Sequence, residues 1–83
     1  MVVVEIFSKD GCHLCEIARD TVYAVRKRHP FELREVSLVE GHPLYETLGV
    51  RVPVITINGA FAFQYKVGEE ELLERLRTIE PQR

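Results

Sequence analysis

Two cysteines are the only residues of this sequence whose type and spacing by themselves suggest covalent chemistry. Cys12 and Cys15 are the sole cysteines, and they stand three positions apart just after Gly11. A Cys-x-x-Cys pair occurs in redox centres, zinc sites, metal-carrying proteins and iron–sulfur sites, so the spacing alone does not choose between them. On the first turn of a helix the two sulfurs would share one face, within reach of each other.

The histidines of the sequence argue against a zinc site within one chain but leave other metal sites possible. A structural zinc ion takes four protein ligands, and the three histidines His13, His29 and His42 form no second paired motif. A metal or iron–sulfur site that binds through Cys12 and Cys15, with a second chain supplying further ligands, stays open. So does the interpretation that both cysteines are ordinary buried residues. A position after glycine at a helix entrance favours a solvent-reachable thiol, and therefore reversible disulfide chemistry.

The residues around the cysteines predict a strand, a turn and a helix. Residues 2–8 are apolar at nearly every position, which is typical of a strand covered on both faces. A helix should follow as far as Arg28, because Pro30 disfavours helical conformation in the residue before it. Six of its residues recur at helical spacing: Leu14, Ile17, Ala18, Thr21, Val22 and Val25. Cys12 at the start of this helix should form a thiolate readily, with a pKa below the value of about 8.5 for a free thiol.

The middle of the chain predicts an outer strand and a short helix. Residues 31–38 mix apolar and charged side chains, which indicates a strand at the edge of the sheet. Residues 43–48 begin with a proline and are followed by Gly49, which suits a short helix with a glycine at its C-terminal end.

The last part of the chain predicts a hairpin and a final helix. Residues 54–57 are β-branched, Asn58-Gly59 suits a two-residue turn, and residues 60–65 form the returning strand. The alternation places Phe61, Phe63 and Tyr65 on one face, predicted to be core against a helix. Acidic residues after Gly68 then begin a helix that runs to about Ile79, with Pro81 closing it.

Length and composition limit the classes of function. With 83 residues, the chain is expected to form one domain, 1–83, around a modest core. No apolar run approaches the ~18 residues of a membrane span. We expect no secretory targeting, because no basic residue stands before the first apolar run, which is short and β-branched. A formal net charge of -2 argues against nucleic-acid binding. We therefore expect a cytoplasmic monomer with neither a nucleic-acid nor a membrane partner.

Taken together, these motifs resemble the thioredoxin fold. The resemblance implies an α/β protein with the order β-α-β-α-β-β-α, in which a four-stranded mixed sheet is flanked by three helices. More narrowly, the sequence is similar to the small glutaredoxins and glutaredoxin-like proteins. Lys9 stands three positions before the first cysteine, as their lysine does, and residues 48–55 are similar to their Gly-Val-x-x-Val-Pro segment. The dipeptide His13-Leu14 between the cysteines is similar to that of a less characterised glutaredoxin-like group.

The resemblance also implies roles for residues outside the cysteine pair. Pro53 should follow a cis peptide bond and face the disulfide, and the backbone of Val52 should pair with a bound thiol peptide. Gly68 and Glu69 stand where glutathione-binding members have glycine followed by acidic or hydroxyl residues, although Val67 replaces the first of their two glycines.

Two residues beside the cysteines are further candidates for substrate binding. Lys9 could add positive charge near the Cys12 thiolate and near the carboxylate of a thiol peptide. His13 could tune the redox couple, because imidazole gains and loses its proton near neutral pH.

The predicted activity is thiol–disulfide exchange, with Cys12 as the attacking nucleophile and Cys15 as the thiol that resolves the mixed disulfide. The expected partners are disulfide-containing proteins or glutathione, and electrons should come from glutathione or from a reductase. We expect no metal and no tightly bound cofactor, with glutathione as a candidate co-substrate. The competing hypothesis is a non-catalytic module that uses the cysteine pair to hold a metal or an iron–sulfur cluster.

Overall fold

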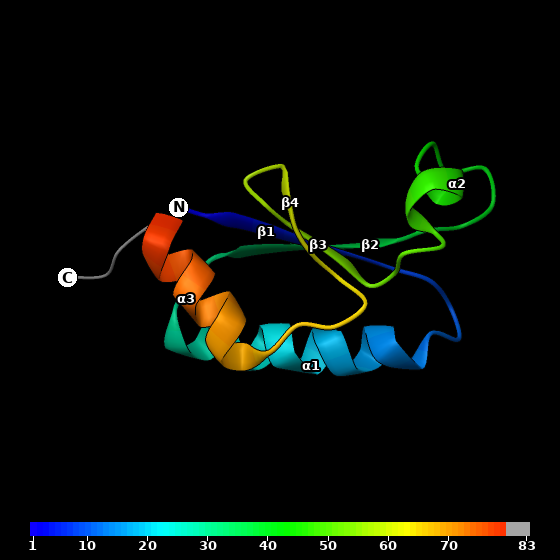
Figure 1. The fold of residues 1–83 in the computed structure, drawn as a ribbon. Helices are drawn as coiled ribbons and strands as arrows, with labels where there is room; N and C mark the ends of the chain where they lie inside the picture. The colour runs from blue at the N-terminus through cyan, green and yellow to red at the C-terminus, as the bar shows by residue number, and fades with distance from the viewer. Residues whose placement is uncertain (80–83) are drawn as a thin grey trace.

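The computed structural model describes residues 1–79, which form a four-stranded mixed sheet with helices on both faces (Figure 1). The elements are β1 (Val3–Ser8), α1 (His13–Arg28), β2 (Glu32–Ser37), α2 (Tyr45–Leu48), β3 (Val54–Ile57), β4 (Ala60–Gln64) and α3 (Glu69–Ile79). Their order and type confirm the predicted fold class. Pro81, predicted to close the last helix, lies outside the described residues.

The sheet topology brings two loops together at one end of the molecule. The strand order is β2-β1-β3-β4, with β1 parallel to β2 and antiparallel to β3. Because β1 and β3 run in opposite directions, the C-terminal end of β1 lies beside the N-terminal end of β3, where Phe7 pairs with Val54. The loop that leads to Cys12 and the segment that ends at Pro53 therefore lie at the same end of the sheet.

Helices α1 and α3 cover one face of the sheet and enclose the main core (Figure 1). Its buried residues are Val2, Val4, Ile6, Ala18, Val22, Val25, Phe31, Ile55, Ile57, Leu72, Leu73 and Leu76. A smaller cluster on the other face packs Phe7, Leu38 and Val54 against α2. Strand β1 contributes to both, which explains its nearly continuous apolar sequence.

Helix α2 begins two residues later than predicted. Before it, the backbone N–H of Leu44 donates to the His42 side chain at 3.0 Å, and the N–H of Tyr45 donates to the His42 carbonyl at 3.0 Å. Residues 42–45 therefore form a tight turn in place of the first predicted helical turn. Gly49 is the C-cap residue, as predicted, and its N–H donates to the Tyr45 carbonyl at 2.9 Å.

The hairpin between β3 and β4 forms as the sequence predicts. Asn58 and Gly59 have φ values of 52° and 85°, the positive values that a tight hairpin turn requires. The Asn58 side-chain oxygen accepts a hydrogen bond from the Val3 N–H at 2.9 Å, and the Asn58 N–H donates to the Val3 carbonyl at 2.8 Å. The turn is thus attached to the central strand β1.

The prediction that Phe61, Phe63 and Tyr65 share a core face is wrong. A bulge shifts the β3–β4 register, so Thr56 pairs with Phe61 whereas Ile55 pairs with Phe63. One extra residue in a strand reverses the side-chain alternation beyond it. Phe63 therefore packs against the main core, while Phe61 is 56% exposed and Tyr65, beyond the strand, is 45% exposed.

Replacement of Leu76 by alanine should lower the free energy of unfolding by about 2–5 kcal/mol, because a fully buried leucine leaves a cavity. Chemical denaturation measures this loss. The matched control is Leu44→Ala, at a leucine that is 39% exposed, which should cost much less. Equal losses in the two variants would contradict the described core.

Candidate functional site

The cysteine pair lies at the start of α1, just after the loop that follows β1. In this loop Gly11 has a φ of 75°, which a glycine adopts without steric cost, and the Cys12 N–H donates to the Lys9 carbonyl at 3.3 Å. This tight turn places Cys12 at the N-cap of α1, in an extended conformation. The predicted position of Cys12 at the start of the helix is confirmed.

The two sulfurs are joined as a disulfide, and their surroundings differ. The Cα atoms of Cys12 and Cys15 are 5.2 Å apart, within the range that a disulfide spans without backbone movement. Cys12 is half-buried, whereas Cys15 is 1% exposed. The backbone N–H of Cys15 also donates to the Cys12 sulfur at 3.2 Å. A partner from solvent can therefore reach the sulfur of Cys12 but not that of Cys15.

Val52 and Pro53 lie at the same end of the sheet as the disulfide. The peptide bond between them is cis, in agreement with the resemblance. Pro53 is buried and Val52 packs beside the α2 cluster. The carbonyl of Pro53 accepts a hydrogen bond from the Tyr65 N–H at 2.9 Å, which ties this segment to the loop after β4.

Lys9 stands three residues before Cys12 and His13 directly follows it, and the side-chain nitrogens of both contact other partners. The Lys9 ammonium lies 5.4 Å from the centre of the Tyr45 ring, a cation–π contact with α2. The His13 side chain is 82% exposed, and its Nδ1 lies 3.5 Å from a carboxylate oxygen of Glu16. Their roles in substrate binding stay predictions.

Gly68 and Glu69 stand at the start of α3 (Glu69–Ile79). Glu70 in the same turn forms an ion pair with Arg28 at 3.2 Å. Arg28 ends α1, so it is about 24 Å along the helix axis from Cys12 at a rise of about 1.5 Å per residue. The predicted contact of Gly68 and Glu69 with glutathione stays a prediction.

Sequence reasoning missed an apolar surface beside the cysteines. The helical spacing grouped Leu14 and Ile17 with Ala18, Val22 and Val25, yet they are 41% and 50% exposed. The number of apolar positions around α1 could have revealed this surface, because they cover more of the helix than one buried face. Cys15, Ala18 and Val22 form one row, three or four positions apart, that already faces the core, so Leu14 and Ile17 form a second row on its flank.

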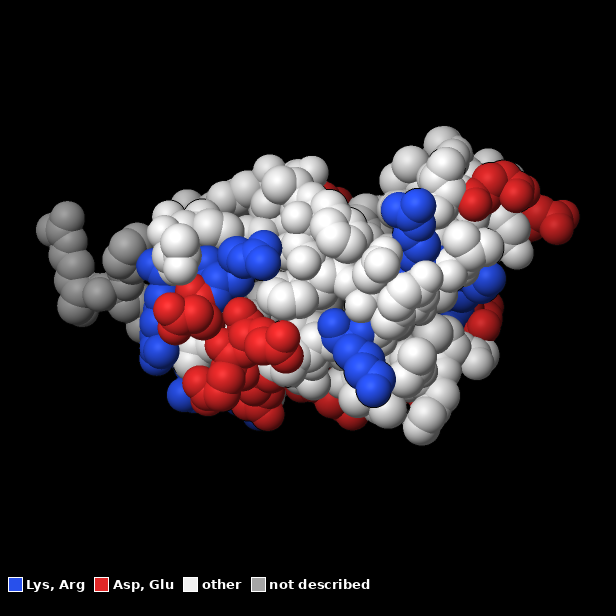
Figure 2. Space-filling view, in the orientation of Figure 1, with Lys and Arg blue, Asp and Glu red and all other residues white. Residues whose placement is uncertain are grey.

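Charged side chains are distributed unevenly around this site. Figure 2 shows acidic side chains gathered over the first turn of α3, where Glu69, Glu70 and Glu71 stand. The surface over the first turns of α1 is mostly uncharged in the same view. Among residues 1–79, no three His, Cys, Asp or Glu side chains converge as a metal-binding group. Within the same residues, no helix has the length and apolar character needed to cross a membrane.

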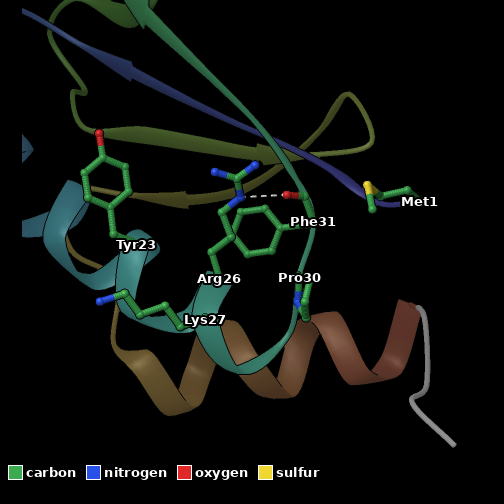
Figure 3. A pocket seen from close by; sticks show the side chains of 6 residues that line it. All are labelled: Met1, Tyr23, Arg26, Lys27, Pro30 and Phe31. Carbon is green, nitrogen blue, oxygen red and sulfur yellow. Dashed lines mark hydrogen bonds between the residues drawn. The ribbon is translucent and has the colours of Figure 1, made fainter.

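A hollow of about 580 Å³ lies at the C-terminal end of α1, away from the cysteines (Figure 3). It is lined by Met1, Tyr23, Arg26, Lys27, Pro30 and Phe31. The Arg26 Nε donates to the Phe31 carbonyl at 2.8 Å, and the Tyr23 hydroxyl donates to the Glu35 carboxylate at 2.9 Å. No thiol lines this hollow, so it is separate from the chemistry of the cysteines.

Comparisons with solved structures define the class of protein first. The chain superposes on protein XcR50 from X. campestris with a TM-score of 0.75 and 21% identity, covering 90% of this chain and 96% of that one. It superposes on thioredoxin f2 from Chlamydomonas reinhardtii with a TM-score of 0.75 and 17% identity, covering 99% and 82% of the two chains. A malaria parasite thioredoxin-2 matches with a TM-score of 0.68 and 15% identity, over 94% and 82%. The protein therefore has the thioredoxin-like fold.

The family follows from the sequence itself. The model of the glutaredoxin-like domain family (DUF836) matches residues 3–77, nearly the whole chain, and the protein belongs to this family. The matched region includes both cysteines, the cis proline and the start of α3.

After reduction, Cys12 should react with iodoacetamide at least about tenfold faster than Cys15 at neutral pH. Its sulfur is accessible and accepts a backbone N–H at a helix start, whereas Cys15 is buried. Short alkylation followed by peptide mass spectrometry measures the two rates in the same sample. Equal rates, or a faster Cys15, would contradict the observed difference in exposure.

Tyr23 should ionise only in more alkaline solution than an ordinary tyrosine does. Its hydrogen bond to Glu35, then desolvation and the negative charge of that carboxylate, raise the pKa of Tyr23 above its ordinary value. The carboxylate stabilises the protonated phenol and repels the phenolate, so Glu35→Gln should move this titration to lower pH. Ultraviolet absorbance against pH measures it, with Tyr23→Phe identifying the step; an unchanged curve in Glu35→Gln would refute the assignment.

Proposed function

We propose that this protein is a thiol–disulfide oxidoreductase that exchanges the Cys12–Cys15 pair with disulfides of proteins or of glutathione. The observation that carries the proposal is the difference between the two sulfurs. Cys12 is accessible at the N-cap of α1, and Cys15 is buried one turn later within disulfide distance. An exposed nucleophile with a protected resolving thiol is the arrangement that a two-step exchange needs. Membership of the glutaredoxin-like family supports the same conclusion.

The reaction consists of two thiol–disulfide exchanges. In the first, the Cys12 thiolate attacks one sulfur of the substrate disulfide, a Cys12–substrate bond forms, and the other substrate sulfur leaves and takes up a proton. In the second, Cys15 loses its proton and attacks the Cys12 sulfur, which forms the Cys12–Cys15 disulfide and releases the second substrate thiol. Two electrons pass to the substrate. Two thiols, from glutathione or from a reductase, return the protein to its reduced form.

The start of α1 also influences the direction of the exchange. Its unpaired backbone N–H groups and dipole stabilise a thiolate at Cys12, and the Cys15 N–H is already directed at this sulfur at 3.2 Å. Each tenfold stabilisation of the thiolate is about 1.4 kcal/mol, which makes the couple about 30 mV more oxidising if other contributions stay constant. We place the reaction in the cytoplasm, where a disulfide between these cysteines would be transient.

Cys12→Ser should abolish reduction of a disulfide substrate, because the attacking sulfur is lost. Cys15→Ser should still attack but should stop at the mixed disulfide, which intact-protein mass spectrometry detects as one substrate half attached to Cys12. Each variant is the control for the other, since both remove one sulfur from the same turn. A mixed disulfide on Cys15 in the Cys12→Ser variant would reverse the two roles.

Metal analysis distinguishes the oxidoreductase from the competing hypothesis of a metal-binding or cluster-binding module. Protein purified without oxygen and analysed for metals and for visible absorbance should contain neither zinc nor iron in stoichiometric amount. Stoichiometric metal that depends on both cysteines, in a protein unable to reduce disulfides, would favour a metal-binding or cluster-binding module.

A further inference from the structure

The hollow drawn in Figure 3, at the C-terminal end of α1, has the size and mixed lining of a small-molecule site. Its volume of about 580 Å³ falls within the range of roughly 300–1,000 Å³ that is typical of ligand pockets. Tyr23, Arg26 and Lys27 line it from the helix, and their spacing of three and four positions places them on one helix face. The apolar part of the lining comes from Met1, Pro30 and Phe31. One face of α1 thus offers an aromatic ring and two cations beside apolar surface.

Hydrogen bonds hold two of these helix side chains in place. The Tyr23 hydroxyl lies 2.9 Å from both carboxylate oxygens of Glu35, and Tyr23 is 39% exposed, so its ring presents a fixed flat surface. The Arg26 Nε donates to the Phe31 carbonyl at 2.8 Å, which fixes the plane of the guanidinium group. In Figure 3 this group lies between the Tyr23 ring and the Met1 side chain. A ligand that enters the hollow therefore meets a ring and a cation whose positions are already set.

The positive charge of the hollow is available to a ligand. The bond to Phe31 uses one of the five N–H donors of the Arg26 guanidinium, and the other four belong to its terminal nitrogens. Among residues 1–79, Lys27 makes no ion pair and no carboxylate side chain lines the hollow. The Glu35 carboxylate, which contacts Tyr23, is also paired with Arg19 at 3.2 Å. The dipole at the end of α1 accounts for basic residues there, but it requires neither a hollow nor a fixed guanidinium.

The two cations and the exposed ring favour a phosphate monoester that carries a flat ring. A phosphate monoester has a charge of about −1.5 to −2 at neutral pH and three acceptor oxygens, which two cations match better than they match a single carboxylate. Arginine binds phosphate through two parallel N–H···O bonds, and a flat heterocycle stacks on an aromatic side chain. The volume is roughly four times the ~150 Å³ of a cavity that holds benzene, so a ring and a phosphate both fit.

We propose that this hollow binds a small phosphate monoester with a flat ring, of the kind that a nucleoside monophosphate represents. The ring lies against Tyr23, and the phosphate accepts hydrogen bonds from Arg26 and Lys27. The site is independent of the proposed function, because Arg26 stands about 21 Å along the helix axis from Cys12 at a rise of about 1.5 Å per residue. The cysteines take no part in this binding.

Three probes separate the contribution of the ring from that of the charge, namely adenosine monophosphate, adenosine and inorganic phosphate. Each is titrated into the isotope-labelled full chain, and the shifts of the backbone amide signals give both the Kd and the place of binding. Adenosine monophosphate should bind at least about tenfold more tightly than either of the other two, because stacking and charge-assisted hydrogen bonds then act together. The shifts should be largest in residues 23–31.

Two substitutions test the contacts, and a third is their control. Lys27→Gln should weaken binding of adenosine monophosphate about fivefold or more, the loss typical of one charge-assisted hydrogen bond, and should leave adenosine binding unchanged. Tyr23→Leu should weaken both by about fivefold or more, because it removes the stacking surface. The matched control is Arg28→Gln, which removes the same charge at the next position from a side chain that pairs with Glu70 and does not line the hollow. It should change the affinity by less than about twofold.

Several results would overturn the proposal. Equal affinities for adenosine monophosphate and inorganic phosphate would do so, because charge attraction alone would then account for the binding. Equal losses in Lys27→Gln and Arg28→Gln would show that net charge matters and the lining of the hollow does not. The absence of saturable binding, or shifts that centre on another part of the chain, would remove the site altogether.

Discussion

The orientation of helix α1 about its own axis is the constraint on which the site depends. Residues three positions apart on a helix differ by about 60° around the axis, so neighbouring sulfurs on one turn can meet different surroundings. Here that rotation buries Cys15 to 1% exposure and leaves Cys12 half-buried at the N-cap. The accessibility of one sulfur and the protection of the other therefore have one common cause, which is the face that α1 turns toward the sheet.

The packing of α1 against β1 and α3 determines which face of the helix turns toward the sheet. Ala18, Val22 and Val25 continue the row begun by Cys15, and all are buried against β1 and α3. A rotation of α1 that exposed Cys15 would also expose these residues, and transfer of apolar surface to water costs about 25 cal/mol per Å². The hydrophobic core thus positions the sulfurs, although most of it lies far from them along the helix.

The antiparallel pairing of β1 and β3 supplies the rest of the site. It places the segment before β3 and the loop after β4 near the start of α1, with the Tyr65–Pro53 hydrogen bond between them. On the other face, α2 contacts Lys9 through the Tyr45 ring. Glu70, in the acidic first turn of α3, pairs with Arg28 at the C-terminal end of α1, and in Figure 2 the surface over the first turns of α1 is mostly uncharged.

The sequence by itself determined the order of elements, the cysteine pair at a helix start and the hairpin at Asn58-Gly59, because each depends on local rules of periodicity, capping and turn geometry. Tertiary structure alone decided which apolar residues are buried. The β-bulge placed Phe61 and Phe63 on different faces, and the width of the α1 stripe left Leu14 and Ile17 exposed. Local pattern cannot settle such cases, since burial depends on which surface a distant segment covers. The partners of Lys9 and Glu70 were decided in the same way, because Tyr45 on α2 and Arg28 at the end of α1 are remote from them in sequence.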